Sequence, residues 1–274
     1  MIQSYQPFMK GTLTPRDPRG LGGLARCRVR RGLAALAALA SLACVLAVGP
    51  ARSSPPVTRL GAGAREVWVL RPTGRVKSIV VFGHGWSTPF PSGFGPWVRH
   101  LRAGGSIVIY PRYRVGAGDS TSSALAAFQA GVESAFRLVR PIHVPVVAVG
   151  KSFGGSAVFY YAASARSWGV PAPVAILSIF PAGPIGALPA GRLSARTYVE
   201  LFVGDADTTA GSGGADTFWR WLSGHPNERR RYVVIHSRPG FVANHDSAQR
   251  SDPIAQAVFW APFDGLIGRA RAGR

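Results

Sequence analysis

The sequence predicts an α/β fold in which a mostly parallel sheet is covered by helices on both faces. From residue 66 onward, apolar runs of four to eight residues alternate with longer amphipathic segments. The short runs are apolar on both faces, which is typical of strands in a parallel sheet that helices cover on each side. We see no internal repeat and no sign of a second domain, so we expect residues 63–270 to form one domain.

The order of the expected elements follows from these patterns. The expected strands are residues 66–70, 78–83, 106–110, 144–150, 173–180, 196–204 and 231–237. The expected helices are residues 95–105, 119–140, 153–166, 214–223 and 253–268. Asp119 and Ser120 are both good caps for the long second helix, because their side-chain oxygens can accept a free backbone N–H.

The first 62 residues are expected to lie outside this domain. Four arginines between residues 26 and 31 precede residues 32–49, which carry no charge and are mostly Ala and Leu. Small residues and prolines follow, so residues 1–51 are expected to hold an export signal cleaved after Gly49 or Ala51. An uncleaved membrane anchor over 32–49 and a buried helix stay open as alternatives. A linker rich in Pro and Ser is expected over 52–62, and we expect the protein to be exported.

Charge and cysteine content limit the classes of partner. The chain has 32 basic and 12 acidic residues, which gives a net charge of +20. The arginines are dispersed along the chain, so we expect no nucleic-acid partner, while attraction to a membrane or an anionic cell envelope stays open. Cys27 and Cys44 both lie in the predicted signal, so the cleaved protein would have no thiol or zinc–thiolate chemistry.

The stretch "VAVGKSFGG", residues 147–155, permits two interpretations. Gly-Lys-Ser ends a phosphate-binding loop, but that loop needs a glycine where this chain has Pro145 within a strand. Gly-x-Ser-x-Gly between a strand and a helix instead predicts a tight turn that exposes a nucleophile. Ser152 is then the nucleophile, and Gly150 and Gly154 give the turn its clearance.

A serine nucleophile needs a histidine base and an acid that orients the base. With this type of turn, the acid and then the histidine follow the serine along the chain. Asp207 follows the expected strand 196–204 and is the predicted acid, with Asp205 as the alternative. His245 follows the last expected strand and is the predicted base, whereas His236 stands at the end of that strand.

The stretch "FGHGW", residues 82–86, predicts the remaining part of the site. A strand ends here, and the next backbone amide, that of Trp86, can face a carbonyl oxygen of a substrate. Together with the amide of Phe153 it would form an oxyanion hole with two donors. His84 is expected to support this loop.

Four motifs in this order resemble those of the α/β-hydrolase superfamily. They are "VVFGHGW", "VAVGKSFGG", "LFVGDADTTAG" and "ANHDSA". The closing segment is similar to the last helix of small bacterial serine hydrolases such as dienelactone hydrolases and extracellular lipases. The resemblance implies an esterase or lipase-like enzyme that needs no cofactor and forms an acyl-enzyme. Lys151 departs from the family pattern, in which His, Tyr, Asp or Glu is frequent.

The substrate is less constrained by the sequence. About 15 residues separate the strands expected at 173–180 and 196–204, where relatives insert a helical lid, so we expect an open site without a large lid. Phe90 and Phe94 are candidates for an apolar acyl pocket on a small or polymeric ester. No cluster with metal-ligand spacing is present, so no metal is expected. An acyltransferase acting on envelope lipids or glycans and a binding protein without catalysis stay open as alternatives.

Overall fold

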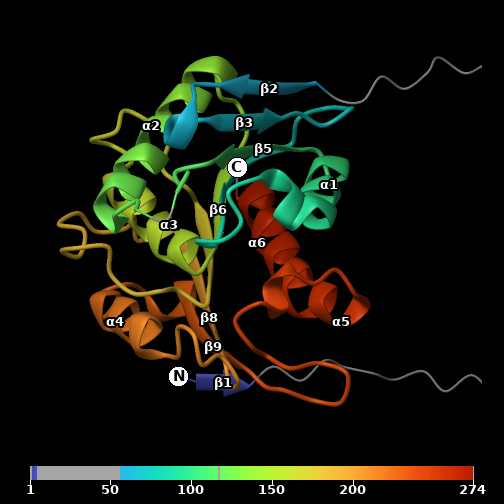
Figure 1. Ribbon diagram of the computed structural model, residues 1–274, viewed down its shortest axis with the longest axis vertical. Coiled ribbons are helices and arrows are strands. Elements are labelled where there is room, and N and C mark those ends of the chain that lie inside the picture. Colours follow the sequence, from blue (N-terminus) through green and yellow to red (C-terminus); the bar gives the residue numbers. More distant parts are fainter. Residues whose placement is uncertain (1, 5–55, 117, 274) are drawn as a thin grey trace, which may run out of the picture. The chain divides into compact units, whose positions relative to one another are not determined.

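The computed structural model describes residues 2–4, 56–116 and 118–273, and its centre is a β-sheet (Figure 1). Eight strands between residues 57 and 235 lie in the order β2-β3-β5-β4-β6-β7-β8-β9. Their bounds are β2 Val57–Leu60, β3 Val67–Leu70, β4 Ser78–Gly83, β5 Ser106–Pro111, β6 Val146–Lys151, β7 Ala175–Ile179, β8 Tyr198–Gly204 and β9 Arg230–Ile235. A ninth short strand, β1 (Ile2–Ser4), pairs in parallel with β9.

The strand order places a crevice at the carboxyl ends of the central strands. β2 and β3 are antiparallel to their neighbours, and β4 to β9 are parallel to one another. β4 lies between β5 and β6, so the chain crosses to one side of β4 after that strand and to the other side after β5. Ligand sites in open α/β sheets form where the strand order reverses in this way, outside the carboxyl ends of the strands.

Helices cover both faces of the sheet, as the sequence predicts. α2, α3 and α4 lie on one face, and α1 and α6 lie on the other (Figure 1). The α-helices are α1 Gly95–Ala103, α2 Thr121–Val139, α3 Phe153–Ser164, α4 Gly213–Trp221, α5 Pro253–Ala255 and α6 Ala261–Ala272. Short 3₁₀ turns are η1 Gly63–Arg65, η2 Pro91–Phe94, η3 Asn227–Arg229 and η4 Ser247–Gln249, and η5 Gln256–Trp260 is a π-helical turn.

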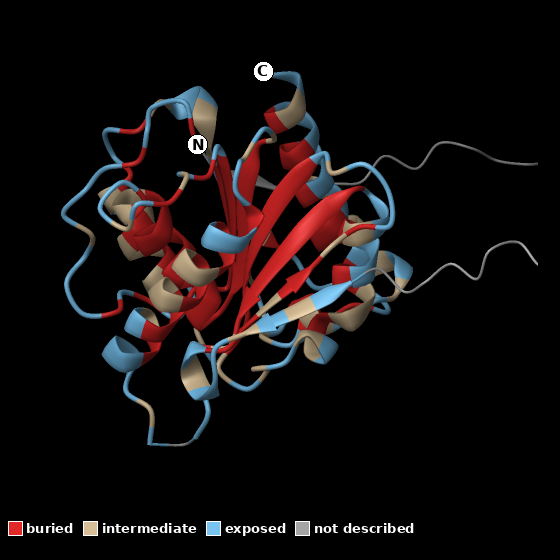
Figure 2. Ribbon diagram, turned by 90° about the horizontal axis from the view of Figure 1, so that it is seen from above, coloured by how far each residue is buried: buried red, intermediate tan, exposed pale blue. Residues whose placement is uncertain are grey.

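Two hydrophobic cores flank the sheet. One core contains Phe128 of α2, Phe159 of α3 and Phe218 of α4, all fully buried. The other contains Trp97 of α1 and Phe263 of α6, whose rings meet edge to face. Figure 2 shows the buried strands in the middle and the exposed residues on the outer helix surfaces and the loops. Burial on both faces explains why the central strands are apolar throughout.

The predicted elements are present, with differences at the amino-terminal boundary. All seven expected strands are found, and Ser120 is the cap of α2, where its Oγ accepts the Ser123 N–H at 3.1 Å. The linker predicted over 52–62 is wrong at residues 57–60, which form β2. This short edge strand is partly exposed along its whole length, so it lacks the buried pattern of the central strands. Residues 180–197 contain no helix, so no helical lid follows β7.

The predicted export signal or anchor over 32–49 lies outside the described residues. Among the residues that the structure describes, none of the helices has the length and apolar character needed to cross a membrane.

Candidate active site

The turn between β6 and α3 holds Ser152 in a strained conformation. Ser152 has φ 59° and ψ −122°, and its backbone N–H donates to the Ile179 carbonyl at 2.9 Å. A methyl group at Gly150 would lie 2.1 Å from the Gly154 carbonyl oxygen, and one at Gly154 would lie 2.2 Å from the Gly83 carbonyl. Both contacts are impossible for real side chains, so the predicted need for glycine on each side of the serine has a direct steric cause.

The side chain of His245 lies within hydrogen-bond distance of both Ser152 and Asp207. The His245 Nε2 is 2.9 Å from the Ser152 Oγ, and the His245 Nδ1 is 2.8 Å from the Asp207 Oδ2. The Asp207 side chain is fully buried and that of His245 is 13% exposed. The three residues lie in the segments that follow β6, β8 and β9, and parallel pairing brings the ends of these strands to one edge of the sheet.

The two candidate acids differ in what their carboxylates contact. The Asp207 Oδ1 accepts the backbone N–H groups of Thr209 and Ala210 at 2.9 and 3.0 Å, which leaves its other oxygen for His245. Asp205 instead accepts the N–H and the hydroxyl of Ser237 at 2.8 and 2.6 Å. These contacts favour Asp207 as the partner of His245 and give Asp205 the role of fixing the loop after β9.

Trp86 and Phe153, whose backbone amides are the predicted oxyanion donors, lie next to each other in the fold. The Trp86 and Phe153 rings are in contact, with centroids 5.1 Å apart, so the two residues are neighbours although 67 positions separate them. Within the described part of the chain, neither amide donates a hydrogen bond to another residue. The Gly154 N–H donates to the His84 carbonyl at 3.0 Å and fastens the start of α3 to the oxyanion loop, residues 84–88. The pair of free donors fits the predicted oxyanion hole.

His84 lies under the oxyanion loop and is completely buried. Its Nδ1 is 2.6 Å from the Gly85 carbonyl oxygen, and its Nε2 is 2.5 Å from the Arg112 carbonyl oxygen. Burial lowers the pKa of His84 to about 4, and the hydrogen bonds to the Gly85 and Arg112 carbonyls act in the opposite direction. These contacts agree with the predicted supporting role of His84.

Sequence reasoning missed two residues that support the site. Among the described residues, Tyr113, Ser152 and Phe180 are the non-glycine residues with positive φ, and each follows a strand at the carboxyl edge of the sheet. The Tyr113 ring stacks on His84 at 3.8 Å, and its hydroxyl donates to the His84 carbonyl. The Phe180 ring lies 6.2 Å from the His245 ring. Strained residues of this kind concentrate at functional sites, but the sequence carries no marker for them.

Arg114 fixes Trp86 from outside. Its Nη1 donates to the Trp86 carbonyl at 2.7 Å, and its guanidinium lies 4.3 Å from the centroid of the Trp86 ring. The side chain therefore holds Trp86, whose amide is a predicted oxyanion donor, in place.

The predicted acyl pocket is wrong at Phe94. Phe94 is 2% exposed and packs in the core against Phe82, with ring centroids 4.9 Å apart, so it offers no surface to a ligand. Its place in η2 turns it inward, which the loop sequence did not indicate. Phe90 is 44% exposed, and its ring lies between Trp68 and the guanidinium of Arg112.

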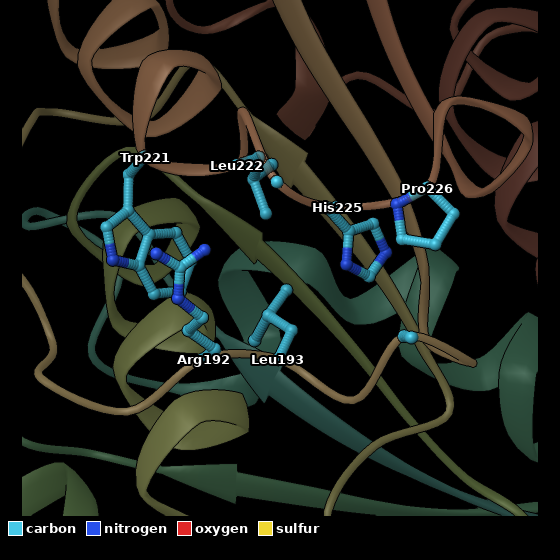
Figure 3. Close-up of a pocket in the computed structure, with 8 residues that line it drawn as sticks. Arg192, Leu193, Trp221, Leu222, His225 and Pro226 are labelled. Carbon is cyan, nitrogen blue, oxygen red and sulfur yellow. The ribbon is translucent and has the colours of Figure 1, made fainter.

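Cavities in the molecule lie at both ends of the sheet. A pocket of about 60 Å³ lies between the end of α4 and the segment before β8 (Figure 3). His225 in its wall is 2.8 Å from the carbonyl oxygen of Thr197, just before β8, so this pocket is at the opposite end from Ser152. A larger cavity of about 500 Å³ is lined by Asp207, Asp205, Trp219 and Tyr232, on the acid side of the site.

The described residues contain no group of three or more His, Cys, Asp or Glu side chains arranged to bind a metal ion. The candidate site brings together a serine, a histidine, an acid and two backbone amides, and groups of these kinds can carry out acyl transfer.

Solved structures resemble this chain at low sequence identity. Esterase 2 of Thermogutta terrifontis, phosphoramylated by tabun, matches with a TM-score of 0.59 and 17% identity over 80% of this chain and 96% of its own. Carboxyl esterase 2 of the mycorrhizal fungus Tuber melanosporum matches with a TM-score of 0.60 and 15% identity over 81% and 89%. An α/β hydrolase from a Medee basin deep-sea metagenome library matches with a TM-score of 0.55 and 12% identity over 78% and 99%.

The chain has the α/β-hydrolase fold. At this level of identity the likeness extends to the fold, and the chemistry has to be argued from the residues of this chain. No family model and no curated protein matches the sequence. The α/β-hydrolase fold accounts for the strand order and for the elbow at the carboxyl end of β6.

Proposed function

We propose that the protein is an exported serine hydrolase that cleaves carboxylic esters through an acyl-enzyme. The observation that carries the proposal is the hydrogen-bonded series Ser152–His245–Asp207 at a strained elbow next to two unpaired amides. Structures of similar fold include proteins named as esterases, which supports an ester as the substrate. The apolar segment 32–49 behind four arginines supports export.

The proposed reaction begins with attack by the Ser152 Oγ on the ester carbonyl carbon. The His245 Nε2, 2.9 Å away, takes the hydroxyl proton as the new carbon–oxygen bond forms. The negative carbonyl oxygen accepts hydrogen bonds from the amides of Trp86 and Phe153. His245 then gives the proton to the alkoxide of the leaving alcohol, and the acyl group remains on Ser152.

Water completes the cycle by the same route. His245 takes a proton from the water, whose oxygen attacks the acyl carbon, and the proton returns to Ser152 as the acid departs. The Asp207 carboxylate accepts a hydrogen bond from the Nδ1–H of His245 at 2.8 Å, which fixes the tautomer and stabilises the imidazolium of each transition state. Since two amides hold the other Asp207 oxygen, the carboxylate stays in this orientation.

The substrate class follows from the surroundings of Ser152. The connection between β7 and β8 carries no helix, so no helical lid from that segment encloses a long acyl chain. Phe94 is withdrawn into the core and provides no acyl-binding surface. We therefore propose esters with short acyl groups, or ester groups on larger molecules, as the substrates.

The test is a series of p-nitrophenyl esters from acetate to laurate, assayed with the full-length protein. We expect turnover that declines with acyl length and a loss of at least about 10³-fold in Ser152→Ala. A fluorophosphonate should label the wild type and leave Ser152→Ala unlabelled. Ser167→Ala, which changes an exposed serine after α3, is the control and should keep both properties. Labelling of Ser152→Ala, or an inactive wild type, would refute the proposal.

A further inference from the structure

Lys151 is a buried cation at the centre of the candidate site, and the proposed reaction does not use it. It is the last residue of β6 and directly precedes Ser152. Its side chain is 3% exposed, although lysine is rarely buried to this degree. The contacts of its side chain show why a lysine is buried at this position.

The first contact is with the histidine loop, residues 236–246. The Lys151 Nζ lies 3.2 Å from the Asp246 Oδ1, and Asp246 directly follows His245. The same carboxylate oxygen accepts the Gln249 Nε2 at 3.1 Å, which fixes its position. The Asp246 side chain is 77% exposed, so this bridge joins a buried cation to a carboxylate at the surface.

The second contact is with the oxyanion loop. A methyl group at Gly85 would lie 3.1 Å from the Lys151 Cδ and 3.4 Å from its Nζ, so the end of the lysine passes directly over Gly85. Gly85 precedes Trp86, whose amide is a proposed oxyanion donor. Lys151 thus contacts the segments on both sides of Ser152.

The charge of Lys151 is costly at this position. Burial lowers the pKa of Lys151, while the nearby carboxylates of Asp246 and Asp207 act in the opposite direction. Because the carboxylate of Asp246 is exposed, solvent screens the pair and the bridge adds little stability. The ammonium is therefore better explained by what it aligns than by the stability that it adds.

We infer that Lys151 is a positioning residue, which through Asp246 holds the histidine loop against the elbow and keeps His245 in line with Ser152. The inference rests on the proposed function. The Lys151–Asp246 bridge connects residues 95 positions apart, and its two ends adjoin the nucleophile and the base. A small displacement of a catalytic group lowers the rate of the chemical step with little effect on substrate binding.

The test compares Lys151→Met, Asp246→Asn and the double variant with the wild type on p-nitrophenyl acetate. We expect each single variant to lower kcat about tenfold with KM nearly unchanged. The double variant should lose no more than the single variants, because either change breaks the same bridge. Lys77→Met is the matched control, since Lys77 is exposed before β4 at the other end of the sheet, and it should leave kcat unchanged.

A pH profile adds a readout that a purely structural role would not move. The groups around the Lys151 Nζ are Asp246 from the histidine loop, Asp207 from the end of β8 and the uncharged Gly85; His245 adjoins both carboxylates. The bridge needs a protonated Lys151, so kcat of the wild type should fall at alkaline pH as Lys151 loses its proton. Asp246→Asn has no bridge to lose, so this alkaline fall should be absent there and should persist in Lys77→Met.

Urea unfolding of the same four proteins gives a readout without activity. The losses in free energy of unfolding in the two single variants should not add in the double variant, because both substitutions break the same bridge. An inactive wild type would refute the proposed function, and the unfolding data would still test the bridge. The inference would be overturned by an active wild type with unchanged kcat in Lys151→Met, or by losses in the two single variants that simply add.

Discussion

The two ends of the sheet each contain a buried acid, and they use it differently. At the carboxyl end, Asp207 has both oxygens occupied, one by two backbone amides and the other by His245. At the amino end, Glu200 of β8 pairs through Oε1 with Arg231 at 3.2 Å and Arg269 at 3.0 Å. Its Oε2 is buried and has no hydrogen-bond partner among the described residues. One acid contacts a histidine and two backbone amides, and the other joins β9 and α6.

The backbone near the two acids differs in how tightly it is confined. The carboxyl end holds Tyr113, Ser152 and Phe180 at positive φ and has glycines in backbone contact at the elbow. At the amino end, α6 contains Gly268, which has no atom near enough to contact an added methyl group. Positive φ angles and backbone contacts that exclude a side chain thus occur around the Ser152 hydroxyl, which is the arrangement expected of a functional site.

The largest expected difference between the ends is in activity. Asp207→Asn should lower kcat on p-nitrophenyl acetate by about 10³- to 10⁴-fold, because the amide cannot hold His245 in the required tautomer. Glu200→Gln and Asp205→Asn should stay within about tenfold of the wild type, since neither residue contacts His245 or Ser152. A larger loss in Asp205→Asn than in Asp207→Asn would reverse the assignment of the acid.

The second expected difference is in tolerance of an added methyl group. Gly150→Ala should lower the free energy of unfolding by about 3 kcal/mol or more, because its methyl would overlap the Gly154 carbonyl. Gly268→Ala, in an exposed position of α6, should raise it by about 0.5–1 kcal/mol through better helix propensity. Urea unfolding measures both values. Equal stability of the two variants would show that the elbow is not confined as described.

The smallest expected effect concerns pH. Burial raises the pKa of Glu200, so the folded protein binds this proton more tightly than the unfolded chain does. Stability contributed by Glu200 should therefore fall as pH rises from about 4.3, the value of a free glutamate, through the raised value in the fold. The slope is at most about 1.4 kcal/mol per pH unit for one group. Urea unfolding of Glu200→Gln against pH should give a flatter curve, and an unchanged slope would contradict the assignment.

The residues of the elbow could be predicted because each requirement there is local. Gly150, Ser152 and Gly154 stand within five positions, and the strand and helix around them are readable from their apolar patterns. Phe94 could not be predicted in the same way. Its inward direction depends on the 3₁₀ turn η2 and on Phe82 of a separate strand, so the loop sequence gave no sign of it.

By itself, the sequence determined the fold class, the order of the strands and helices along the chain, and the candidates Ser152, Asp207 and His245. Periodicity and glycine spacing act over short distances along the chain and stay visible without coordinates. Only the tertiary structure brought Asp207 rather than Asp205 to His245, added β2 to the sheet, and joined Lys151 to Asp246. The contacts of Asp207 with His245 and of Lys151 with Asp246 link segments that are far apart in sequence, so their distance is set by the packing of the whole sheet. β2 pairs with the nearby β3, but its residues carry no buried pattern that marks a strand.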